Sequence, residues 1–394
     1  MLKWTLIKSL LIASLISPLL VLGNSAEAKD LPEPEWVYNI DKGEWSLPWN
    51  IVPGVVVDSQ GNQSLLGNKV VGNQSYLENI DPLSGKLRWS KLENFDYVPS
   101  EDGYIFMFDK NNKVSAMNLA TGKIIWTGTL PFDKKVQYYS YSSDIYAGKN
   151  GSLYVASHSK DYKATLYHYD SNGRKTKKYT LPYSIVGIEG DYVFAKTYSD
   201  DPNTYILNLA TGKKIVTAKN GISYIPVNVL KDGTIVTQNV VKNAVTLKAY
   251  NAKGQLKWTK KLPYVSERTE TYTLQNRLLF MDGKNNSLKL YASDGKLLAS
   301  KSYKPLATGY NRIRRMIEVS RDQQSLMLTV KKGDRYEINI LDSTNLNVIK
   351  AFSETERDFY SNANYELLNN RTHFIVVDYT GKSIVNYDLT RIDY

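Results

Sequence analysis

Residues 117–126 read Met-Asn-Leu-Ala-Thr-Gly-Lys-Ile-Ile-Trp, and variants of this pattern recur along the chain. An apolar segment ends at Asn118, Gly122 follows four residues later, and a second apolar segment leads to Trp126. Asn opens a turn by hydrogen bonding to nearby backbone, and Gly adopts the positive φ that a tight connection needs. The pattern therefore predicts two antiparallel strands joined by a short turn.

Further copies of the pattern extend over most of the sequence. Close copies lie at 80–89 and 207–216, shorter ones at 169–173, 250–258 and 291–295, and a decayed copy at 341–346 lacks the glycine. The glycines of the six intact turns are spaced by 37, 51, 39, 42 and 41 residues, and they are Gly85, Gly122, Gly173, Gly212, Gly254 and Gly295. Six turns in register at one period predict a repeat architecture.

Each period has room for four strands, and the fifth illustrates this with apolar segments at 223–230, 234–240, 246–250 and 255–262. Four antiparallel strands in about forty residues are typical of a β-propeller blade. We find no 3.6-residue apolar period after residue 28, so helical solenoids are excluded. The expected fold is all-β, an eight-bladed propeller with blades at 51–92, 97–130, 135–181, 183–219, 221–262, 265–303, 306–352 and 358–394.

The last of these blades is one strand short, whereas the chain has a spare strand before the first blade. The spare strand lies at 35–40 or at 44–49. Pairing it into the last blade would close the ring and remove the remaining unpaired edge. A seven-bladed ring is the alternative, because the second blade is thin.

The Asp/Asn-x-x-Thr/Ser-Gly-Lys-x-x-Trp copies resemble the PQQ-like repeat of quinoprotein alcohol dehydrogenases and of the propeller subunit of the outer-membrane barrel assembly machinery. The resemblance covers the first two blades well and the fourth and fifth in part. It implies that a Trp of the outer strand packs against the neighbouring blade. Trp89, Trp126 and Trp258 match that position, whereas Val216 and Ala299 depart from it. The repeat specifies a fold and leaves function open.

The start of the chain predicts export. Lys3 and Lys8 form a basic region before an apolar stretch at 9–23, and small residues stand at Ala26 and Ala28. This is the pattern of a signal peptide cleaved after Ala28, which leaves a propeller domain at 29–394. The expected location is outside the cell or in the cell wall, without a stable membrane span; an uncleaved anchor is the alternative.

Composition narrows the partners. The chain has no Cys, so packing rather than disulfides must hold an exported fold of this size together. A formal net charge of +11 favours anionic partners, which outside a cell are wall polymers or lipid headgroups rather than nucleic acid. The basic clusters at 174–178 and 312–315 are interpreted as solvated surface. Thirty Tyr residues are interpreted mainly as strand-face packing, and those at 138–141 also suit a binding rim.

Candidate chemistry is sparse. Ser-x-x-Lys occurs at 157–160 and 293–296, but its partner motifs are missing. Asp200 and Asp201 lie in a Pro-Asn turn and are interpreted as loop residues. Two histidines of the third blade are a poor metal site without nearby carboxylates. The three histidines of the chain are His158, His168 and His373.

These observations predict a monomeric binding or scaffold protein with no catalytic residues, no metal and no cofactor. Loops held at fixed positions by the ring would contact a protein or an anionic wall polymer. The alternative is an enzyme, either a quinone-dependent dehydrogenase or a propeller that acts on glycans. Enzymes similar to the former often carry a vicinal Cys pair, which is absent here.

Overall fold

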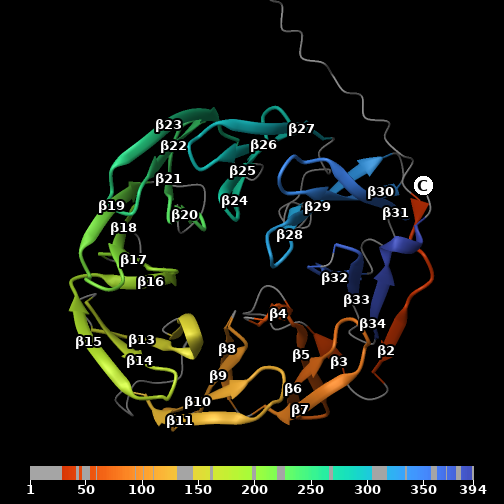
Figure 1. Cartoon of the computed structure of the whole chain (residues 1–394), viewed down its shortest axis with the longest axis horizontal. Coiled ribbons are helices and arrows are strands. Elements are labelled where there is room, and N and C mark those ends of the chain that lie inside the picture. Colours follow the sequence, from red (N-terminus) through yellow and green to blue (C-terminus); the bar gives the residue numbers. More distant parts are fainter. Residues whose placement is uncertain are drawn as a thin grey trace, which may run out of the picture.

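The computed structural model forms a ring of eight blades, and each blade is a sheet of four antiparallel strands (Figure 1). It describes residues 29–392 except positions 59, 94, 101, 110 and 370 and the segments 41–43, 47–53, 131–144, 160–162, 198–200, 220–226, 266–268, 304–316, 333–334, 356–361 and 379–382. The predicted all-β, eight-bladed propeller is confirmed, and the seven-bladed alternative is wrong because the thin second blade has all four strands.

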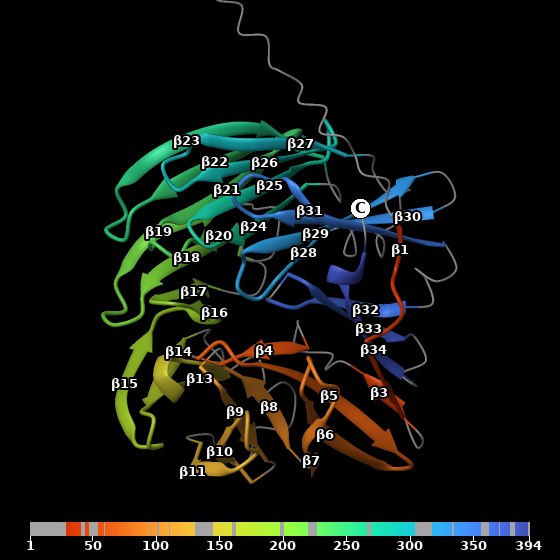
Figure 2. The same ribbon diagram turned by 45° about the vertical axis from the view of Figure 1, so that its right-hand side comes forward.

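The strands of a blade follow one another from the axis outward, so that the first strand is innermost and the fourth lies on the rim (Figures 1 and 2). Blade 1 contains β4 (Val55–Val57), β5 (Gln63–Val71), β6 (Gln74–Ile80) and β7 (Leu87–Leu92), and blade 2 contains β8 (Asp96–Pro99), β9 (Tyr104–Phe108), β10 (Lys113–Asn118) and β11 (Ile124–Thr129). Blade 3 contains β12 (Ile145–Ala147), β13 (Leu153–His158), β14 (Ala164–Tyr169) and β15 (Lys175–Leu181), and blade 4 contains β16 (Ser184–Glu189), β17 (Tyr192–Lys196), β18 (Asn203–Asn208) and β19 (Lys214–Lys219).

The second half of the ring repeats this order. Blade 5 contains β20 (Val227–Val229), β21 (Ile235–Val241), β22 (Ala244–Tyr250) and β23 (Leu256–Pro263), and blade 6 contains β24 (Glu270–Leu274), β25 (Arg277–Asp282), β26 (Ser287–Ala292) and β27 (Leu297–Ser302). Blade 7 contains β28 (Ile317–Val319), β29 (Ser325–Lys332), β30 (Arg335–Asp342) and β31 (Val348–Thr355), and blade 8 contains β32 (Asn362–Leu367), β33 (His373–Asp378) and β34 (Ser383–Asp388).

The N-terminal segment joins three blades. β1 (Lys29–Asp30) lies parallel to β31 on the rim of blade 7, and β2 (Trp36–Asn39) pairs antiparallel with β34 as the fourth strand of blade 8. β3 (Glu44–Ser46) then pairs with β5 of blade 1. The ring is therefore closed by the first of the two predicted spare strands; the second belongs to blade 1 instead.

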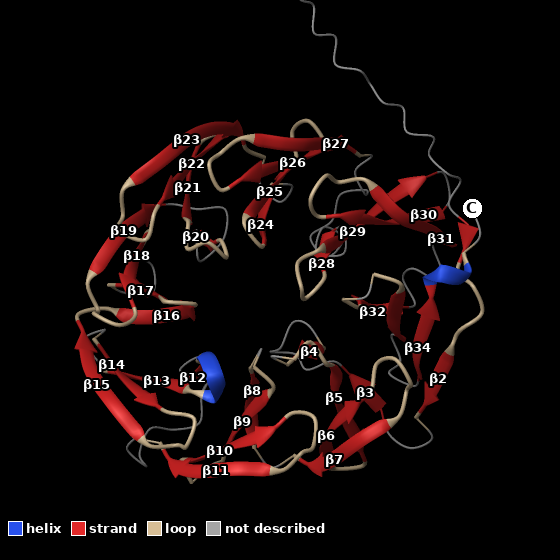
Figure 3. Cartoon of the chain, viewed as in Figure 1, coloured by secondary structure: helices blue, strands red, loops and turns tan. Residues whose placement is uncertain are grey.

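Helical structure among the described residues is confined to two short 3-10 turns, η2 (Lys149–Gly151) and η3 (Leu389–Arg391) (Figure 3). Within the same residues, we find no helix of the length and apolar character that a membrane crossing needs.

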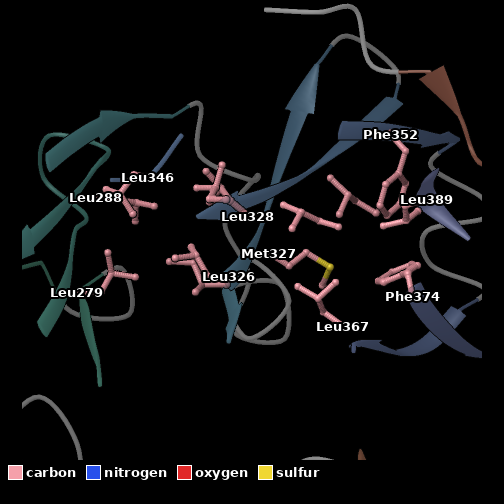
Figure 4. Close-up of a cluster of buried hydrophobic side chains, with 14 of the residues drawn as sticks. Leu279, Leu288, Leu326, Met327, Leu328, Leu346, Phe352, Leu367, Phe374 and Leu389 are labelled. Atoms are coloured by element: carbon pink, nitrogen blue, oxygen red, sulfur yellow. The ribbon is translucent and has the colours of Figure 1, made fainter. Parts of the chain in front are cut away.

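The core is divided among the contacts between neighbouring blades, because each twisted sheet buries both faces against its neighbours. The largest cluster of buried apolar side chains crosses blades 6, 7 and 8, and Figure 4 shows it from Leu279 of blade 6 through Leu328 of blade 7 to Phe374 of blade 8. Smaller clusters fill the other contacts. Side chains that could act on a partner are therefore those outside these clusters, on the turns, the rim and the innermost strands.

Candidate interaction surface

The turns between third and fourth strands contain the six glycines predicted from the repeat. All six have positive φ, from +65° at Gly212 to +87° at Gly295. In the turn of blade 2, the backbone N–H groups of Thr121 and Gly122 donate to the side chain and to the carbonyl of Asn118, each at 2.9 Å. Asn and Gly thus make the turn in the way that the sequence pattern implies.

Each tryptophan at the repeat position lies on the turn glycine of the next blade. A Cβ placed on Gly122 would lie 2.9 Å from the Trp89 ring, one on Gly173 would lie 2.5 Å from Trp126, and one on Gly295 would lie 2.8 Å from Trp258. The indole N–H of Trp89 also donates to the Leu119 carbonyl at 2.7 Å, and that of Trp258 to the Ser293 carbonyl at 2.9 Å. The turn needs glycine both for its φ and for this close approach.

Sequence reasoning missed a fourth tryptophan of the same kind. Trp36 in β2 lies on Gly85 of blade 1, where an added Cβ would be 2.7 Å from the indole ring, and its N–H donates to the Leu83 carbonyl at 3.0 Å. The signal was a Trp in the spare strand. Its blade could be assigned only once the closing strand was known.

Other blades fill the tryptophan position differently. Val216 is buried and Ala299 half-buried. Gly212 is contacted by Leu181, and the nearby Tyr179 hydroxyl donates to the Leu209 carbonyl at 2.7 Å.

The two remaining turns have other solutions. Gly254 is contacted by Ile215 of blade 4. In the decayed turn of blade 7, Leu346 takes the glycine's place with a φ of +61°.

The turns between first and second strands form a complete circle of contacts at one end of the ring, which we call the first face. In the first four contacts, Asp58 lies against Gly103, Asp102 accepts a hydrogen bond from the Asn150 N–H, Lys149 forms an ion pair with Asp191 (2.9 Å), and the Tyr192 hydroxyl donates to the Gly233 carbonyl (3.1 Å). In the other four, the Lys231 N–H donates to the Gln275 carbonyl (2.9 Å), the Gln275 side-chain amide to the Asp322 carbonyl (2.9 Å), the Asp322 N–H to the Asn369 side chain (3.0 Å), and the Asn369 N–H to the Gln63 side chain (2.9 Å). Many polar groups of the first face thus bind a neighbouring blade.

The histidines have structural partners and do not converge. His158 and His168 lie on the adjacent strands β13 and β14, but they face Ala164 and Tyr154 in the register and are not opposite each other. Their Nδ1 atoms lie 2.9 Å from the Ser184 hydroxyl and 2.6 Å from the Thr176 hydroxyl. Burial and the nearby Lys177 lower the pKa of His168, which favours its neutral form.

His373 takes part in ring closure. Its Nε2 lies 2.9 Å from a carboxylate oxygen of Glu35, the residue that precedes β2. Glu35 in turn accepts from the Asn386 amide at 3.2 Å. Across the described ranges, no group of three or more His, Cys, Asp or Glu side chains has the proximity that a metal ion requires.

Two buried carboxylates, Asp201 and Asp282, also form structural hydrogen bonds and ion pairs. Asp201 accepts from the Thr197 hydroxyl and from the Asn203 N–H, while Asp282 forms an ion pair of 2.6 Å with Lys289. Burial opposes ionisation of Asp282, but hydrogen bonds from Lys289 and Asn285 outweigh it and lower its pKa.

Of the Ser-x-x-Lys matches, 293–296 forms the turn under Trp258. The other match includes Lys160, which lies outside the described residues, as do Asp200, the predicted signal peptide at 1–28, the Tyr cluster at 138–141 and the basic cluster at 312–315.

The rim is a second surface that could contact a partner. We define it as the fourth strands together with the turns that precede them. Its exposed large apolar residues occur mostly in blades 6, 7, 8, 1 and 2, and blades 3 to 5 contribute Leu256 alone among the described residues; the others are Leu297, Leu298, Val348, Val37, Leu83, Leu87, Leu92, Ile124 and Ile125.

A scan against models of protein families finds no match, and a search of curated proteins finds none either. Solved structures do match. The C-terminal WD40 domain of Sif2 is 12% identical with a TM-score of 0.52, over 92% of this chain and 99% of that one. The Dos1 propeller is 11% identical with a TM-score of 0.51, over 90% and 94%. BamB from Moraxella catarrhalis is 11% identical with a TM-score of 0.42, over 90% and 99%.

At these identities the matches to Sif2 and Dos1 show the propeller fold and leave function open. The similarity to BamB is too weak to decide between repeat families. The resemblance to the PQQ-like repeat therefore stays a prediction from the sequence.

Proposed function

We propose that this chain is a binding scaffold that works outside the cytoplasm and has no catalytic activity of its own. The signal-peptide pattern at 1–28 supports export. The non-catalytic part is supported by the contacts of the three histidines and of Asp282, whose side chains bind neighbouring strands or the closing segment.

The observation that carries the proposal is the closed ring of contacts. β2 completes blade 8, and the first-face circle connects every blade to the next. A ring held in this way keeps its rim and turns at fixed relative positions, so little conformational entropy is lost when a partner binds. The partner we expect is a protein or an anionic polymer of the cell wall.

Export is tested by recovering the chain from the source cells and sequencing its N-terminus. We expect the chain in the wall fraction or the medium, with Lys29 as its first residue. A chain that retains residues 1–28 and stays with the membrane would contradict free release and favour the anchor.

Binding is tested with the immobilised chain and a soluble extract of the cell envelope. We expect salt-sensitive retention of an anionic polymer, or retention of one defined protein, and we expect loss of polymer retention after phosphate polymers are removed from the extract. Absence of both would contradict the scaffold proposal. Dye reduction by the chain after loading with PQQ and calcium would contradict the non-catalytic part.

A further inference from the structure

Basic residues gather on the rim of three consecutive blades. We define the basic arc as the turns and fourth strands of blades 3, 4 and 5, which are residues 170–181, 208–219 and 251–263. The arc contains eleven Lys or Arg and one Asp or Glu. The corresponding rim stretches of the other five blades contain seven Lys or Arg and five Asp or Glu, and they are residues 35–40, 81–92, 118–130, 292–302 and 342–355. β15, β19 and β23 follow one another along the outside of the ring (Figure 1).

The charges of the arc are exposed and almost unneutralised. Ten of the eleven basic side chains are exposed, and Lys260 is half-buried. Arg174 forms an ion pair with Asp170 at 3.2 Å. For the other ten, the described part of the chain provides no carboxylate within 4.0 Å. The arc is therefore a field of positive charge on the molecular surface.

Tyrosine rings hold several of these ammonium groups in place. Lys178 Nζ lies 5.7 Å from the centre of the Tyr167 ring, and Lys214 Nζ lies 5.7 Å from that of Tyr205. Lys260 Nζ lies 5.0 Å from the Tyr291 ring. A cation–π contact orients an ammonium group without cancelling its charge. The same Tyr residues therefore reduce the side-chain entropy that a ligand would have to remove.

Protection of a sheet edge does not explain the arc. Lysine on a rim strand prevents edge-to-edge pairing with another molecule. The rim strands of blades 1, 2 and 6 have the same need, yet their turns and strands carry mixed or few charges. An excess of ten positive charges confined to three neighbouring blades costs repulsion energy that edge protection does not demand.

We propose that the basic arc binds a linear polyanion that follows the rim across blades 3, 4 and 5. This inference rests on the proposed binding role. Ten of the eleven basic residues are Lys, which acts as a hydrated point charge, whereas Arg matches the two oxygens of a phosphate or carboxylate. Recognition by the arc therefore depends on the number and spacing of anionic groups more than on their chemical identity.

A polymer fits this surface better than a membrane does. The arc is convex (Figure 1), so an extended chain can follow it, whereas a flat bilayer touches a convex edge over a short length. Stable attachment of a basic surface to a bilayer usually adds apolar side chains that enter the lipid. In the described part of the arc Leu256 is the sole large apolar side chain exposed.

The test compares two triple variants of the full chain. Lys175→Gln, Lys177→Gln and Lys178→Gln remove three charges from the arc, and the control Lys86→Gln, Lys91→Gln and Lys123→Gln removes three from the rim of blades 1 and 2. Affinity for poly(glycerol phosphate) is measured between 50 and 400 mM NaCl. Each lysine engaged contributes about 0.7 to the slope of log affinity against log salt. We expect the arc variant to lose about 2 from this slope and at least tenfold in affinity at 100 mM, and the control to stay within about twofold.

Three further probes separate the possible ligands. A carboxylate polymer of equal charge should bind within a few fold of the phosphate polymer, and monomeric glycerol phosphate should not bind. Stronger binding of phosphatidylglycerol vesicles than of the polymer, at equal phosphate concentration, would overturn the assignment to a polymer. Equal losses in the two triple variants would overturn the arc as the site.

Failure of this inference is distinguishable from failure of the proposed function. A chain that binds no polyanion at any salt concentration but retains one protein from the envelope extract overturns the basic arc and leaves the scaffold role standing. A chain that retains neither overturns both. Matching unfolding curves for wild type and the two variants exclude loss of fold as the cause.

Discussion

The contacts between blades are of two kinds, and the difference shows what a repeat motif contributes. Four contacts have a tryptophan on a glycine turn: blade 8 with 1, 1 with 2, 2 with 3, and 5 with 6. Within the part of the chain that the structure describes, four others lack it: 3 with 4, 4 with 5, 6 with 7, and 7 with 8. The ring nevertheless closes, so other interactions must replace the tryptophan.

One kind of replacement lies on the rim itself. The turns of blades 2 and 4 have the same sequence, Asn-Leu-Ala-Thr-Gly-Lys at 118–123 and 208–213. Trp89 donates to the Leu119 carbonyl of the first, and Tyr179 donates to the Leu209 carbonyl of the second. A phenol and an indole thus satisfy corresponding backbone acceptors, while Leu181 contacts the glycine that the indole would cover.

The other kind of replacement lies in the interior. The cluster that crosses blades 6, 7 and 8 contains twenty buried apolar residues, whereas the next largest contains ten. Phe352 and Phe374 face each other in it, with ring centres 5.0 Å apart. At the contacts of blade 6 with 7 and of blade 7 with 8, the core is therefore continuous, whereas the contacts of blade 3 with 4 and of blade 4 with 5 have separate, smaller clusters.

The largest expected effect follows from this interior replacement. Phe352→Ala should cost about 4 kcal/mol of unfolding free energy, because it removes a fully buried ring at a contact that has no rim tryptophan. Phe352→Leu keeps most of the volume and should cost about 1 kcal/mol. Urea unfolding followed by tryptophan fluorescence measures both. A cost for Phe352→Ala below about 1 kcal/mol would mean that the core does not replace the missing rim contact.

Three glycine variants sharpen the comparison on the rim. Gly122, Gly212 and Gly72 have φ values of +66°, +65° and +60°, so alanine is strained equally at all three. An added Cβ meets the Trp89 ring at 2.9 Å at Gly122, a Leu181 methyl at 3.1 Å at Gly212, and nothing within 4 Å at Gly72. We expect losses of about 3, 2 and 1 kcal/mol respectively for Gly→Ala.

The ranking of the three variants is the informative result, because the backbone strain is shared. Thermal unfolding at one scan rate gives it. Equal losses at Gly122 and Gly72 would show that the indole moves aside without cost and that tryptophan packing contributes little to the contact.

Part of this arrangement could be predicted from the sequence, because the residues that form a turn are close together in the chain. The spacing of Gly85, Gly122 and the later turn glycines predicted the repeat, the number of blades and the closing strand. The role of Trp36 was not accessible, because its blade is completed by strands more than 300 residues later. Tyr179 stands two residues beyond the position of the repeat tryptophan, so the motif overlooks it.

The surfaces that could bind a partner were harder to predict from the sequence than the fold was. Seven contacts of the first-face circle join residues 41 to 48 positions apart, such as Lys149 with Asp191, and the eighth joins Asn369 with Gln63, 306 positions away. Their proximity follows from ring geometry alone. From the sequence alone, the cluster at 174–178 is interpreted as solvated surface. The structure places β15, β19 and β23 next to one another on the rim, and this cluster thereby becomes one part of the basic arc.

A smaller effect tests the tyrosine that replaces tryptophan between blades 3 and 4. Tyr179→Phe removes the hydrogen bond to the Leu209 carbonyl and should cost about 1 kcal/mol. Tyr167→Phe is the matched control: the described structure gives its hydroxyl no hydrogen-bond partner, so the expected cost is close to zero. Burial raises the pKa of Tyr179, so the phenol keeps its proton and the difference between the two variants should persist at pH 10. No difference between them in urea unfolding would show that the hydroxyl does not replace the indole.

The smallest effect concerns the ion pair between blades 7 and 8, where Arg371 lies 3.0 Å from Asp342. Burial opposes ionisation of Asp342, but hydrogen bonds from Thr344 and the charge of Arg371 outweigh it, so its pKa is lowered. The unfolded chain then takes up a proton at higher pH than the folded chain, and the stabilisation is present above about pH 4 and lost as the pH falls through the folded pKa. Asp342→Asn should cost about 1 kcal/mol at pH 7 and progressively less as the pH falls below about 4. Asp81→Asn breaks an ion pair with Arg88 inside blade 1, and the pKa of Asp81 is lowered in the same direction, so this variant should show the same pH dependence. In double variants with Phe352→Ala only Asp342→Asn should deviate from additivity, because only its ion pair crosses the contact that Phe352 stabilises. Additive costs in both double variants would mean that the rim and the core of that contact act independently.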